Sequence, residues 1–444
     1  MNYKNKKVLI VGLGKSGLSA ARFFISRKAR VSGYDKKYIK KAAAEIKNSA
    51  NLIMNTGPGK VNPQNYDIIV TSPGVSPKNP ILKQAGKHGV PVISELEAGY
   101  REVSGVRVIA VTGTNGKTTT CRMIENLTAG RSVVAGNIGT PLTSILNLVK
   151  KKDILVLEVS SYQIPYTPSL KPDIGVVLNI FPEHLDWHGN YDNYFRAKKK
   201  LFDRQKAGQG SVLNNQLPGL NNFIEGLESE KYFFSLDYHD KYGCYLKNNI
   251  IFWRDARGVE KIIELDTFSL KGTHNIENYM AALCASKILK IDKNKLNNFE
   301  LPLHRLEEIK TKDGVTFVND SKATNIQATV RALESYRRPV ILLMGGKSKN
   351  SFHPGLITEI NKKVKTLILF GASRFNLKDK FKDINPKIKV NVKQKLRPAV
   401  ELAVREKEKG DTVLFSPGGS SFDEFDNYKQ RGDKFKQWVE DLIP

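Results

Sequence analysis

The sequence contains few cysteines and no long hydrophobic run, and each absence argues against a class of protein. Only Cys121, Cys244 and Cys284 occur among 444 residues, and no two of them have CxxC spacing. A disulfide framework or a thiolate zinc site is therefore not expected. The first apolar run, Val8–Val11, ends at Gly12. No later run approaches the roughly 20 apolar residues of a membrane span, so we expect a cytoplasmic protein without membrane insertion.

Acidic residues are also scarce, because 44 Asp and Glu stand against 71 Lys and Arg, which gives a formal net charge of +27. Such a surplus favours anionic partners, but it concerns long-range attraction and solubility and not the fold. It raises the alternative of a nucleic-acid-binding protein. The sequence has neither a recognition-helix signature nor an RNP-type aromatic motif. We therefore expect no nucleic-acid partner and interpret most of the surplus as a lysine-rich surface.

The hydrophobic pattern predicts an α/β protein. Short apolar, β-branched runs alternate with segments of helix length, which is typical of parallel sheets covered by helices. The pattern forms three blocks, and we predict domains over residues 1–102, 103–301 and 302–444. Alternating stretches between roughly residues 210 and 270 predict a small β-rich annex to the central domain, which we interpret as structural.

A glycine-rich turn, Gly12–Gly17 (GLGKSG), follows the first predicted strand. Glycines at this position let the backbone approach a pyrophosphate at the start of a helix. Asp35 ends the next predicted strand, where a carboxylate can accept a ribose hydroxyl. Alone, this pattern is compatible with NAD and hence with a dehydrogenase. Any nucleotide diphosphate could use the same turn, and a tight turn without a ligand needs the same glycines.

A second glycine-rich segment is stronger evidence for nucleotide binding. The segment Thr112–Thr119 (TGTNGKTT) follows an apolar strand and precedes a predicted helix. Its amides and Lys117 would hold nucleotide phosphates, and Thr118 would offer a hydroxyl to Mg²⁺. Its spacing departs from the standard P-loop, because Val111 stands where the first glycine is expected. A purely structural turn would not need the sequence GKTT at the helix start.

An acidic residue follows the next apolar strand. Glu158 ends the run Ile154–Leu157, and a carboxylate at the carboxyl end of a strand beside a P-loop is suited to holding Mg²⁺. The alternative is a glutamate on the surface at the end of a strand. A later loop, EHLDWHG, contains His184, Trp187 and His188. The loop by itself barely favours a function for His184, and we assign none to Trp187 or His188.

Several motifs together resemble the Mur ligase family. They are TGTNGKTT, LEVSSYQ, NIFPEHLDWHG with YFRAK, GTHNIENYMAA, LPLHRLEEI and NDSKATN, and the resemblance extends from Gly12 to Gly432. TGTNGKTT alone also suits a folylpolyglutamate synthase, whereas NDSKATN resembles the branch of the family that adds D-glutamate. Another ligase of the family, with a different acceptor amino acid, is the nearest alternative.

The resemblance implies a fold and an activity. The fold has a Rossmann-like N-terminal domain, a P-loop ATPase-like central domain with a parallel sheet and a small β annex, and a Rossmann-like C-terminal domain. The activity is ATP-dependent ligation of D-glutamate to UDP-N-acetylmuramoyl-L-alanine through an acyl phosphate, in peptidoglycan precursor synthesis. ATP, Mg²⁺ at two sites and small-molecule substrates are implied, and we expect a monomer. Closure about a hinge near Leu301–Arg305 would exclude water from the acyl phosphate.

The resemblance also assigns roles to individual residues, position by position. The residues implied at the UDP substrate are Lys15, Ser16, Asp35, Lys36, Lys37, Ser72, Asn137 and Gln163. Those implied at ATP are Gly113, Thr114, Asn115, Gly116, Lys117, Thr118, Thr119, Asn275, Arg305 and Asp320. Those implied at D-glutamate are Lys322, Thr324, Lys349, Ser421 and Tyr428. The implied metal ligands are Thr118, Glu158, His184 and Lys198, and the implied catalytic residues are Lys117, His184 and Lys198.

Two of these roles need special chemistry, and two departures from the family pattern leave the acceptor contacts open. Lys198 matches a lysine that the family carbamylates, which would turn a cation into an anionic ligand of Mg²⁺. His184 is our candidate for the base that takes a proton from the amine of D-glutamate. The loop GGKSK is one residue shorter than expected, so Lys347 could replace Lys349. Tyr428 stands where phenylalanine is expected.

Overall fold

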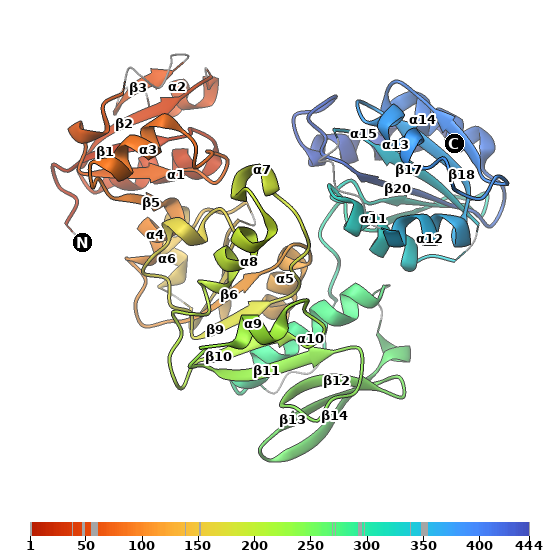
Figure 1. The fold of residues 1–444 in the computed structure, drawn as a ribbon, viewed down its shortest axis with the longest axis horizontal. Coiled ribbons are helices and arrows are strands. Elements are labelled where there is room, and N and C mark those ends of the chain that lie inside the picture. Colours follow the sequence, from red (N-terminus) through yellow and green to blue (C-terminus); the bar gives the residue numbers. More distant parts are fainter. Residues whose placement is uncertain are drawn as a thin grey trace. The chain divides into compact units, whose positions relative to one another are not determined.

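The computed structural model describes residues 2–37, 39–46, 49–54, 61–137, 139–150, 152–268, 270, 272–291, 295–296, 298–337, 339–347 and 354–443. These residues form three sheets and the helices that cover them (Figure 1). The chain divides into two compact units, Met1–Thr267 with Glu277–Asn297, and Phe268–Ile276 with Asn298–Pro444. The first unit holds two of the sheets and the second unit holds one. The predicted α/β class is therefore confirmed, while the domain boundaries after residues 102 and 301 stay predictions.

The first sheet is parallel throughout and has the order β3-β2-β1-β4-β5. Its strands are β1 (Lys7–Val11), β2 (Arg30–Asp35), β3 (Ala50–Met54), β4 (Ile68–Thr71) and β5 (Val92–Ser94). Its helices are α1 (Lys15–Ser26), α2 (Lys40–Ile46), α3 (Pro80–Lys87) and α4 (Glu95–Tyr100).

Both faces of this sheet are covered. Because side chains alternate along a strand, Val8 and Ile10 of β1 pack in one core cluster with α1. Leu9 and Val11 point to the other face and pack with α3. The strand order reverses between β1 and β4, and such a switch point is where open α/β sheets bind ligands. The glycine-rich turn leaves the carboxyl end of β1 at this place.

The second sheet has nine strands in the order β14-β13-β12-β11-β10-β9-β6-β8-β7. Its strands are β6 (Arg107–Thr112), β7 (Ser132–Gly136), β8 (Ile154–Glu158), β9 (Ile174–Val177), β10 (Gly210–Asn214), β11 (Glu230–Ser235), β12 (Gly243–Lys247), β13 (Ile250–Asp255) and β14 (Gly258–Glu264). The helices that follow them are α5 (Lys117–Leu127), α6 (Leu146–Val149), α7 (Leu185–His188), α8 (Tyr191–Lys199), α9 (Leu220–Ile224) and α10 (Thr273–Ile288).

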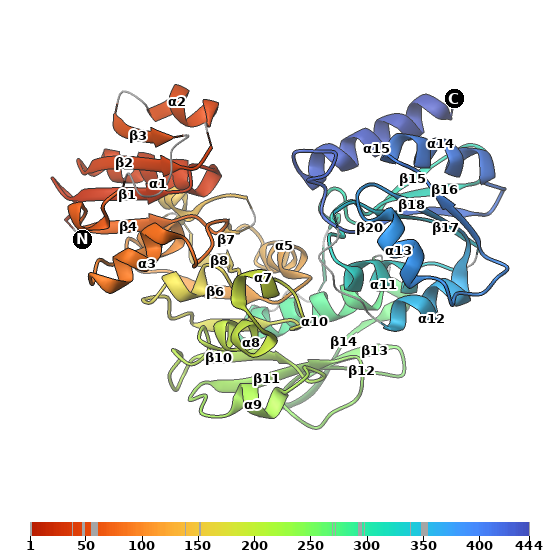
Figure 2. The ribbon, with the colours of Figure 1, turned by 45° about the horizontal axis from the view of Figure 1, so that its top comes forward.

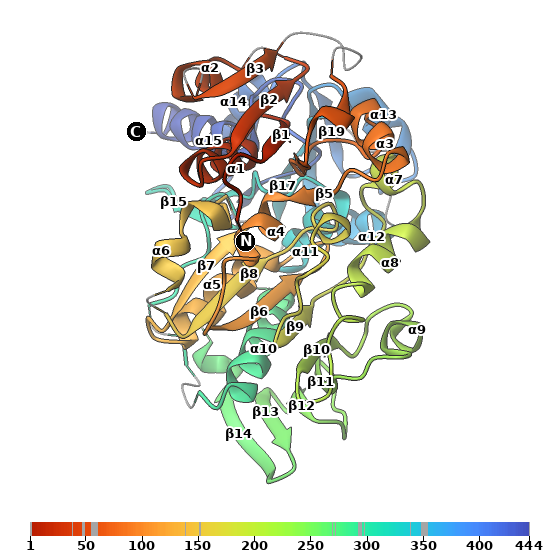
Figure 3. The ribbon, with the colours of Figure 1, turned by 90° about the vertical axis from the view of Figure 1, so that its left-hand side faces the viewer.

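The predicted β annex continues this sheet. Strands β10, β11 and β12 extend the parallel part, and β13 and β14 then add antiparallel strands at the edge (Figure 3). The strands of the parallel core are buried along their length, as in β8, where all five residues are buried. Such continuous apolar runs are expected of strands that helices cover on both faces. Among the described helices, none has the length and apolar character that crossing a bilayer requires.

The third sheet has the order β15-β16-β20-β17-β18-β19, and only β15 is antiparallel to its neighbour. Its strands are β15 (Glu307–Lys310), β16 (Thr316–Asn319), β17 (Val340–Gly345), β18 (Val364–Phe370), β19 (Lys389–Val392) and β20 (Thr412–Gly418). Its helices are α11 (Ile326–Glu334), α12 (Pro354–Lys363), α13 (Arg374–Lys380), α14 (Leu396–Glu406) and α15 (Tyr428–Leu442). Leu342 and Met344 pack with α11 and α12. Ile341 and Leu343 face α14 and α15, so helices cover both faces (Figure 2).

Helix α4 joins the two sheets of the first unit. The buried carboxylate of Glu95 accepts hydrogen bonds from the backbone amide and the hydroxyl of Thr143, both at 2.7 Å. Glu97 accepts from the amide and hydroxyl of Ser169 at 3.0 and 2.6 Å. These bonds connect a helix that follows the first sheet with loops of the second. The glycine-rich turn and the P-loop are therefore held in one compact unit.

Candidate functional site

The loop between β6 and α5 has the backbone that an anion site needs. Gly116 is the N-cap of α5 at φ 88°, a conformation that glycine adopts more readily than other residues. A Cβ atom at this position would collide with Oδ1 of Asn278. Helix α5 has no acidic residue in its first turn and no side-chain cap. Its positive N-terminal end is therefore suited to a phosphate.

The amine of Lys117 lies over the same loop. Its Nζ donates to the carbonyl oxygens of Gly113 and Thr114 at 2.7 and 2.8 Å. The loop is held from outside as well, because the amide of Asn115 donates to Oδ1 of Asn179 at 2.9 Å. A phosphate group can replace these two carbonyl oxygens as partners of the amine.

The two predicted metal ligands beside the P-loop are in contact. Oγ1 of Thr118 donates to Oε2 of the buried Glu158 at 2.7 Å, and Nδ2 of Asn137 donates to Oε1 at 3.1 Å. Carboxylate, hydroxyl and amide oxygens are the ligands that Mg²⁺ prefers, so the donor set fits this ion. Within the described ranges, no group of three or more His, Cys, Asp and Glu could hold a metal. A metal site here therefore needs oxygen donors of other residue types.

Lys198 belongs to α8 and is 1% exposed. Its Nζ donates to the carbonyl of Gly113 at 3.0 Å and lies 4.8 Å from the ring centre of Tyr194. Burial, together with the neighbouring charge of Lys117, holds the pKa of Lys198 well below its usual value, against the opposing effect of Glu183. The amine is therefore driven toward its neutral, nucleophilic form. Lys198 is therefore not part of the lysine-rich surface.

An aromatic cluster surrounds His184. The histidine is the N-cap of α7 at φ 58°, and its Nε2 lies 3.7 Å from Oε2 of Glu183. The ring of Tyr162 lies 4.7 Å from that of His184 and 5.0 Å from that of Trp187. Tyr162 also stacks on His188, with 6.0 Å between centres and 7° between planes. The cluster fixes the loop that carries His184 close to the end of β8.

His188 is a buried member of this cluster that the sequence did not reveal as functional. Its Nε2 lies 3.0 Å from Oγ of Ser161. Burial lowers the pKa of His188 to about 4, with Asp186 opposing. His188 is therefore neutral at pH 7. The one available signal was its place one helical turn after His184.

The glycine-rich turn of the first sheet is held by two of the residues predicted at the UDP substrate. Gly12 has φ 90°, and a Cβ there would lie 2.9 Å from Cγ2 of Val75. Oγ of Ser72 donates to the carbonyl of Gly12 at 2.7 Å. Oδ2 of Asp35 accepts from the amide of Leu13 at 2.8 Å. These bonds give the turn a fixed shape at the switch point of the sheet.

The remaining residues predicted at the UDP substrate fall into two places. Those around the glycine-rich turn are Lys15, Ser16, Lys36 and Lys37. Of these, the three lysines are exposed, and the amide of Lys37 donates to Oδ1 of Asp35 at 3.0 Å. Gln163 is buried near the end of β8, where its Oε1 accepts from the amide and hydroxyl of Ser160 at 3.1 and 2.9 Å. Asn137 directly follows β7, the neighbour of β8 in the second sheet.

The second unit contains three residues predicted at ATP, Asn275, Arg305 and Asp320. Oδ2 of Asp320 accepts from Oγ of Ser416 at 2.8 Å. Burial raises the pKa of Asp320 to about 7, although the bond from Ser416 and the charge of Arg305 oppose this. Asn275 is buried in the same unit, where its amide donates to the carbonyl of Gly272 at 2.9 Å. Asp320 is thus a carboxyl group that titrates near neutral pH.

The residues predicted at D-glutamate also belong to this unit. Nζ of Lys322 lies 5.8 Å from the ring centre of Tyr428, at the start of α15. The amide of Thr324 donates to the carbonyl of Lys322 at 2.9 Å, and Ser421 is buried after β20. Lys347 has an exposed side chain. Lys349 lies outside the described residues.

Arg431 is a fully buried cation that the sequence concealed. Its guanidinium donates to Oγ and the carbonyl oxygen of Ser321 at 3.1 and 2.8 Å, and to the carbonyl of Gly419 at 3.1 Å. It therefore fastens the NDSKATN segment to the loop after β20. In a sequence rich in lysine and arginine, one arginine in a helical pattern is indistinguishable from a surface residue.

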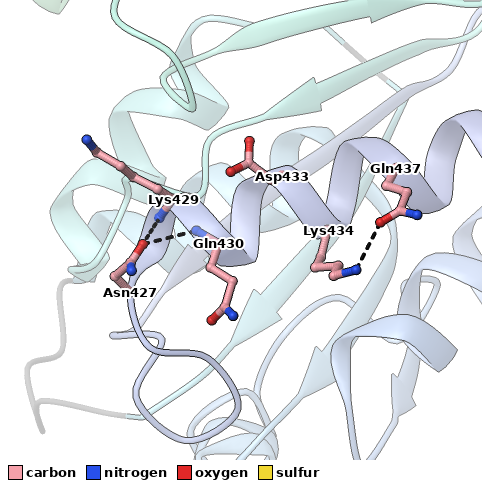
Figure 4. Close-up of a pocket in the computed structure, with 6 residues that line it drawn as sticks. All are labelled: Asn427, Lys429, Gln430, Asp433, Lys434 and Gln437. Carbon is pink, nitrogen blue, oxygen red and sulfur yellow. Dashed lines mark hydrogen bonds between the residues drawn. The ribbon is translucent and has the colours of Figure 1, made fainter. Parts of the chain in front are cut away.

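A depression on α15 has none of the predicted site residues in its lining (Figure 4). Its lining residues are Asn427, Lys429, Gln430, Asp433, Lys434 and Gln437. Asn427 is the N-cap of the helix, where its Oδ1 accepts from the amides of Lys429 and Gln430 at 2.9 and 3.0 Å. The side-chain oxygen of Asn427 is thus used to cap the helix.

Comparison with known proteins gives concordant matches along the chain. Residues 6–94 match the domain family "Mur ligase MurD-like, N-terminal domain". Residues 111–286 match "Mur ligase middle domain". Residues 304–419 match "Mur ligase, glutamate ligase domain".

Solved structures support the same fold. A UDP-N-acetylmuramate-alanine ligase from Thermotoga maritima superposes with a TM-score of 0.59 at 15% identity, covering 98% of this chain and 100% of that one. A MurF ligase from the same organism, in complex with ADP, gives a TM-score of 0.59 at 18% identity, with 99% and 95% covered. Identities this low show the fold alone.

Curated relatives are closer in sequence. A protein named UDP-N-acetylmuramoylalanine--D-glutamate ligase from Koribacter versatilis is 36% identical over 99% of this chain and 98% of its own length. The protein of the same name from Acidobacterium capsulatum is 37% identical over 99% and 97%. Identity at this level over nearly the whole of both chains means that the chain belongs to the Mur ligase family, in the group of UDP-N-acetylmuramoylalanine--D-glutamate ligases.

Proposed function

We propose that the enzyme joins the carboxylate of UDP-N-acetylmuramoyl-L-alanine to the amine of D-glutamate, with conversion of ATP to ADP and phosphate. As a member of the family it is an ATP-dependent ligase of peptidoglycan precursor synthesis. The observation that carries the reaction is the P-loop at the start of α5, with Lys117 over the loop and Thr118 paired to Glu158. We propose that the enzyme acts as a monomer in the cytoplasm.

The first step activates the carboxylate. One of its oxygens forms a bond to the γ-phosphorus of ATP, and ADP leaves. Lys117 moves from its two loop carbonyls to the phosphates and neutralises the charge on the transferring group. Bound Mg²⁺, held by Thr118 and Glu158, would neutralise further charge on the phosphates.

The second step forms the amide. The amine nitrogen of D-glutamate bonds to the acyl carbon, and the tetrahedral intermediate collapses with loss of phosphate. The amine must be neutral to attack, so a base has to take its proton. His184 is the proposed base. The aromatic cluster holds its ring, and Glu183 at 3.7 Å stabilises the imidazolium that forms.

A modified lysine completes the proposed metal sites. The neutral amine of Lys198 forms a bond to the carbon of CO₂ and loses a proton, which gives a carbamate. Burial and the nearby Lys117 support this step, because both favour the neutral amine over the ammonium ion. The carbamate is an anion with two oxygen donors, and these suit a second Mg²⁺.

Each substrate is proposed to have its own domain, over residues 1–102, 103–301 and 302–444. The glycine-rich turn with Ser72 and Asp35 binds the UDP group. The residues already assigned to ATP bind that nucleotide. Lys322, Thr324, Ser421 and Tyr428 bind D-glutamate, together with Lys347 or Lys349. Lys347 has support from its exposed amine and from a loop fixed by two backbone bonds to Ser420 at 2.8 and 3.0 Å.

The test is phosphate release from ATP in the presence of UDP-N-acetylmuramoyl-L-alanine and a panel of amino acids. Release that needs D-glutamate, with the coupled product identified by mass, is the expected result. Lys117→Gln should abolish release, whereas Lys200→Gln, on an exposed residue after α8, should retain it. Release with a different amino acid alone would refute the proposed acceptor.

A further inference from the structure

Trp187 connects the two sheets of the first unit. Its indole Nε1 donates to the carbonyl oxygen of Val75 at 3.3 Å, across 112 positions of sequence. An indole has a single polar hydrogen, and a partly buried one usually finds one partner. Here the partner is a backbone carbonyl of the loop that follows β4. The bond therefore ties α7 to the first sheet at one defined point.

Val75 belongs to the loop that shapes the glycine-rich turn. Its amide donates to the carbonyl of Ser72 at 3.0 Å. Ser72 in turn holds the carbonyl of Gly12, and the Val75 side chain fills the space beside Gly12. A displacement of Val75 therefore changes the surroundings of the proposed UDP-binding turn.

On its other side, Trp187 supports the loop of His184. Its ring centre lies 4.4 Å from that of His188 and 5.0 Å from that of Tyr162, which in turn contacts His184. Helix α7 has four residues, too few to be stable through its backbone bonds alone. The position of His184 therefore depends on the packing of these rings.

We propose that Trp187 is a positioning residue, which sets the place of His184 relative to the turn that holds the sugar nucleotide. This proposal rests on the proposed function in one respect, namely that the glycine-rich turn binds UDP. The sugar nucleotide must reach from that turn to the reacting carboxylate beside the P-loop. The bond from Trp187 to Val75 fixes the distance between the glycine-rich turn and the loop of His184. The reacting carboxylate is thereby placed beside His184 and Lys117.

The variant that isolates the bond is Trp187→Phe, which removes the indole N–H and keeps an aromatic ring in the cluster. One hydrogen bond corresponds to a change of roughly 3- to 10-fold. We expect KM for UDP-N-acetylmuramoyl-L-alanine to rise by about that factor, while KM for ATP stays unchanged. A merely structural role would lower the melting temperature and leave both KM values unchanged, or raise both alike. Equal values of both KM for variant and wild type would overturn the proposal.

Fluorescence provides a second readout. The other tryptophans are Trp253 and Trp438, neither of which belongs to the proposed machinery. In the variant W253F/W438F, the emission of Trp187 should change on titration with UDP-N-acetylmuramoyl-L-alanine and not with ATP alone. Unchanged emission while calorimetry reports binding would count against the coupling.

Hydrogen exchange without any ligand separates this proposal from the proposed function. Trp187→Phe should speed exchange in the segments that contain Val75 and His184 and leave α15 as in the wild type. Unchanged exchange in both segments overturns the coupling, whatever the substrate proves to be. Absence of calorimetric binding to the wild type would instead refute the proposed function and leave the exchange result to decide the coupling.

Discussion

The chemistry expected at Lys198 can be tested on that residue alone. Its amine is buried and has a lowered pKa, and the proposed carbamate would supply oxygen ligands for Mg²⁺. Lys198→Ala should lose at least about 100-fold in kcat, the size expected when a group that stabilises transition-state charge is removed. Added formate or acetate should restore part of the rate, because a free carboxylate can occupy the space. Phosphate release measures both effects.

A matched control and a direct signal accompany this test. Lys200→Ala, on an exposed residue after the same helix, should keep the wild-type rate with and without acetate. With ¹³CO₂, the wild type should give a carbamate carbon resonance that the Lys198 variant lacks. Absence of rescue together with absence of that resonance would exclude the modification.

Gly116 offers a second test at the scale of one residue. Gly116→Ala places a Cβ against Asn278 at φ 88°, so the loop must change shape to accept it. We expect KM for ATP to rise at least tenfold, about 1.4 kcal/mol, which is within the strain of a left-handed non-glycine residue. Gly130→Ala is the control, since Gly130 also has positive φ (81°) and has nothing within 4 Å of its Cβ position. It should lower stability and leave KM for ATP unchanged. An unaltered KM in the Gly116 variant would contradict the role of the loop.

The sequence was sufficient to identify residues whose partners are close in sequence, or whose partners lie at the ends of adjacent parallel strands. The GKTT motif could be recognised because its loop and the start of the helix are contiguous in sequence. The contact of Thr118 with Glu158 followed from parallel strands β6 and β8 ending at one edge. Arg431 and His188 were missed because their role depends on partners brought together by packing. For Arg431, the partner Ser321 lies 110 positions away.

Helix α4 provides a test at the scale of elements. Burial raises the pKa of Glu95 to about 7 from 4.5, despite the hydrogen bonds from Thr143. The folded protein therefore binds this proton more tightly than the unfolded chain does. The resulting stability is complete below about pH 4.5 and is lost as pH rises through about 7. Acidic conditions should thus stabilise the contact that α4 makes between the two sheets.

Glu95→Gln removes the titration and keeps an oxygen that can accept from Thr143. At pH 5 the variant and wild type should unfold at similar urea concentrations. At pH 8 the variant should be more stable, by at most about 3 kcal/mol, since one pKa unit corresponds to 1.36 kcal/mol. Glu228→Gln, on an exposed side chain, is the control and should behave alike at both pH values. A variant that is destabilised equally at pH 5 and pH 8 would show that the carboxylate is charged in the fold.

The annex illustrates what alternation in a sequence can and cannot predict about elements. A period of two indicates strands and their buried face, and β10 to β14 are strands. It does not indicate the neighbour of each strand. Gly243 of β12 pairs with Phe233 of β11, and this contact joins the antiparallel strands to the parallel sheet. The sequence therefore predicted an annex to the central domain, and the structure shows that its strands belong to the central sheet.

At the scale of the whole molecule, the surplus charge is unevenly distributed. The first 102 residues carry 18 Lys and Arg against six Asp and Glu, and residues 362–397 carry 12 against two. In the first region, Lys15 lies in the glycine-rich turn, and Lys36 and Lys37 follow Asp35, which bonds to the amide of Leu13 in that turn. A UDP-sugar, ATP and D-glutamate are all anions, and a positive potential raises their local concentration. This accounts for part of the surplus near the turn, and nothing in the proposed reaction requires the second region.

The division of the proposed ATP contacts between the two units leads to the last prediction. Lys117 belongs to the first unit, and Arg305 and Asp320 belong to the second. The proposal that all three act on one ATP requires both units to bind the same nucleotide, which would also keep water from the acyl phosphate. We expect the radius of gyration from small-angle X-ray scattering to fall when a non-hydrolysable ATP analogue and UDP-N-acetylmuramoyl-L-alanine are added together. Arg305→Ala should show a smaller decrease, because it removes one contact of the second unit with the phosphates. Scattering curves that are identical with and without both ligands, under conditions where calorimetry shows both bound, would mean that the second unit does not close on the nucleotide.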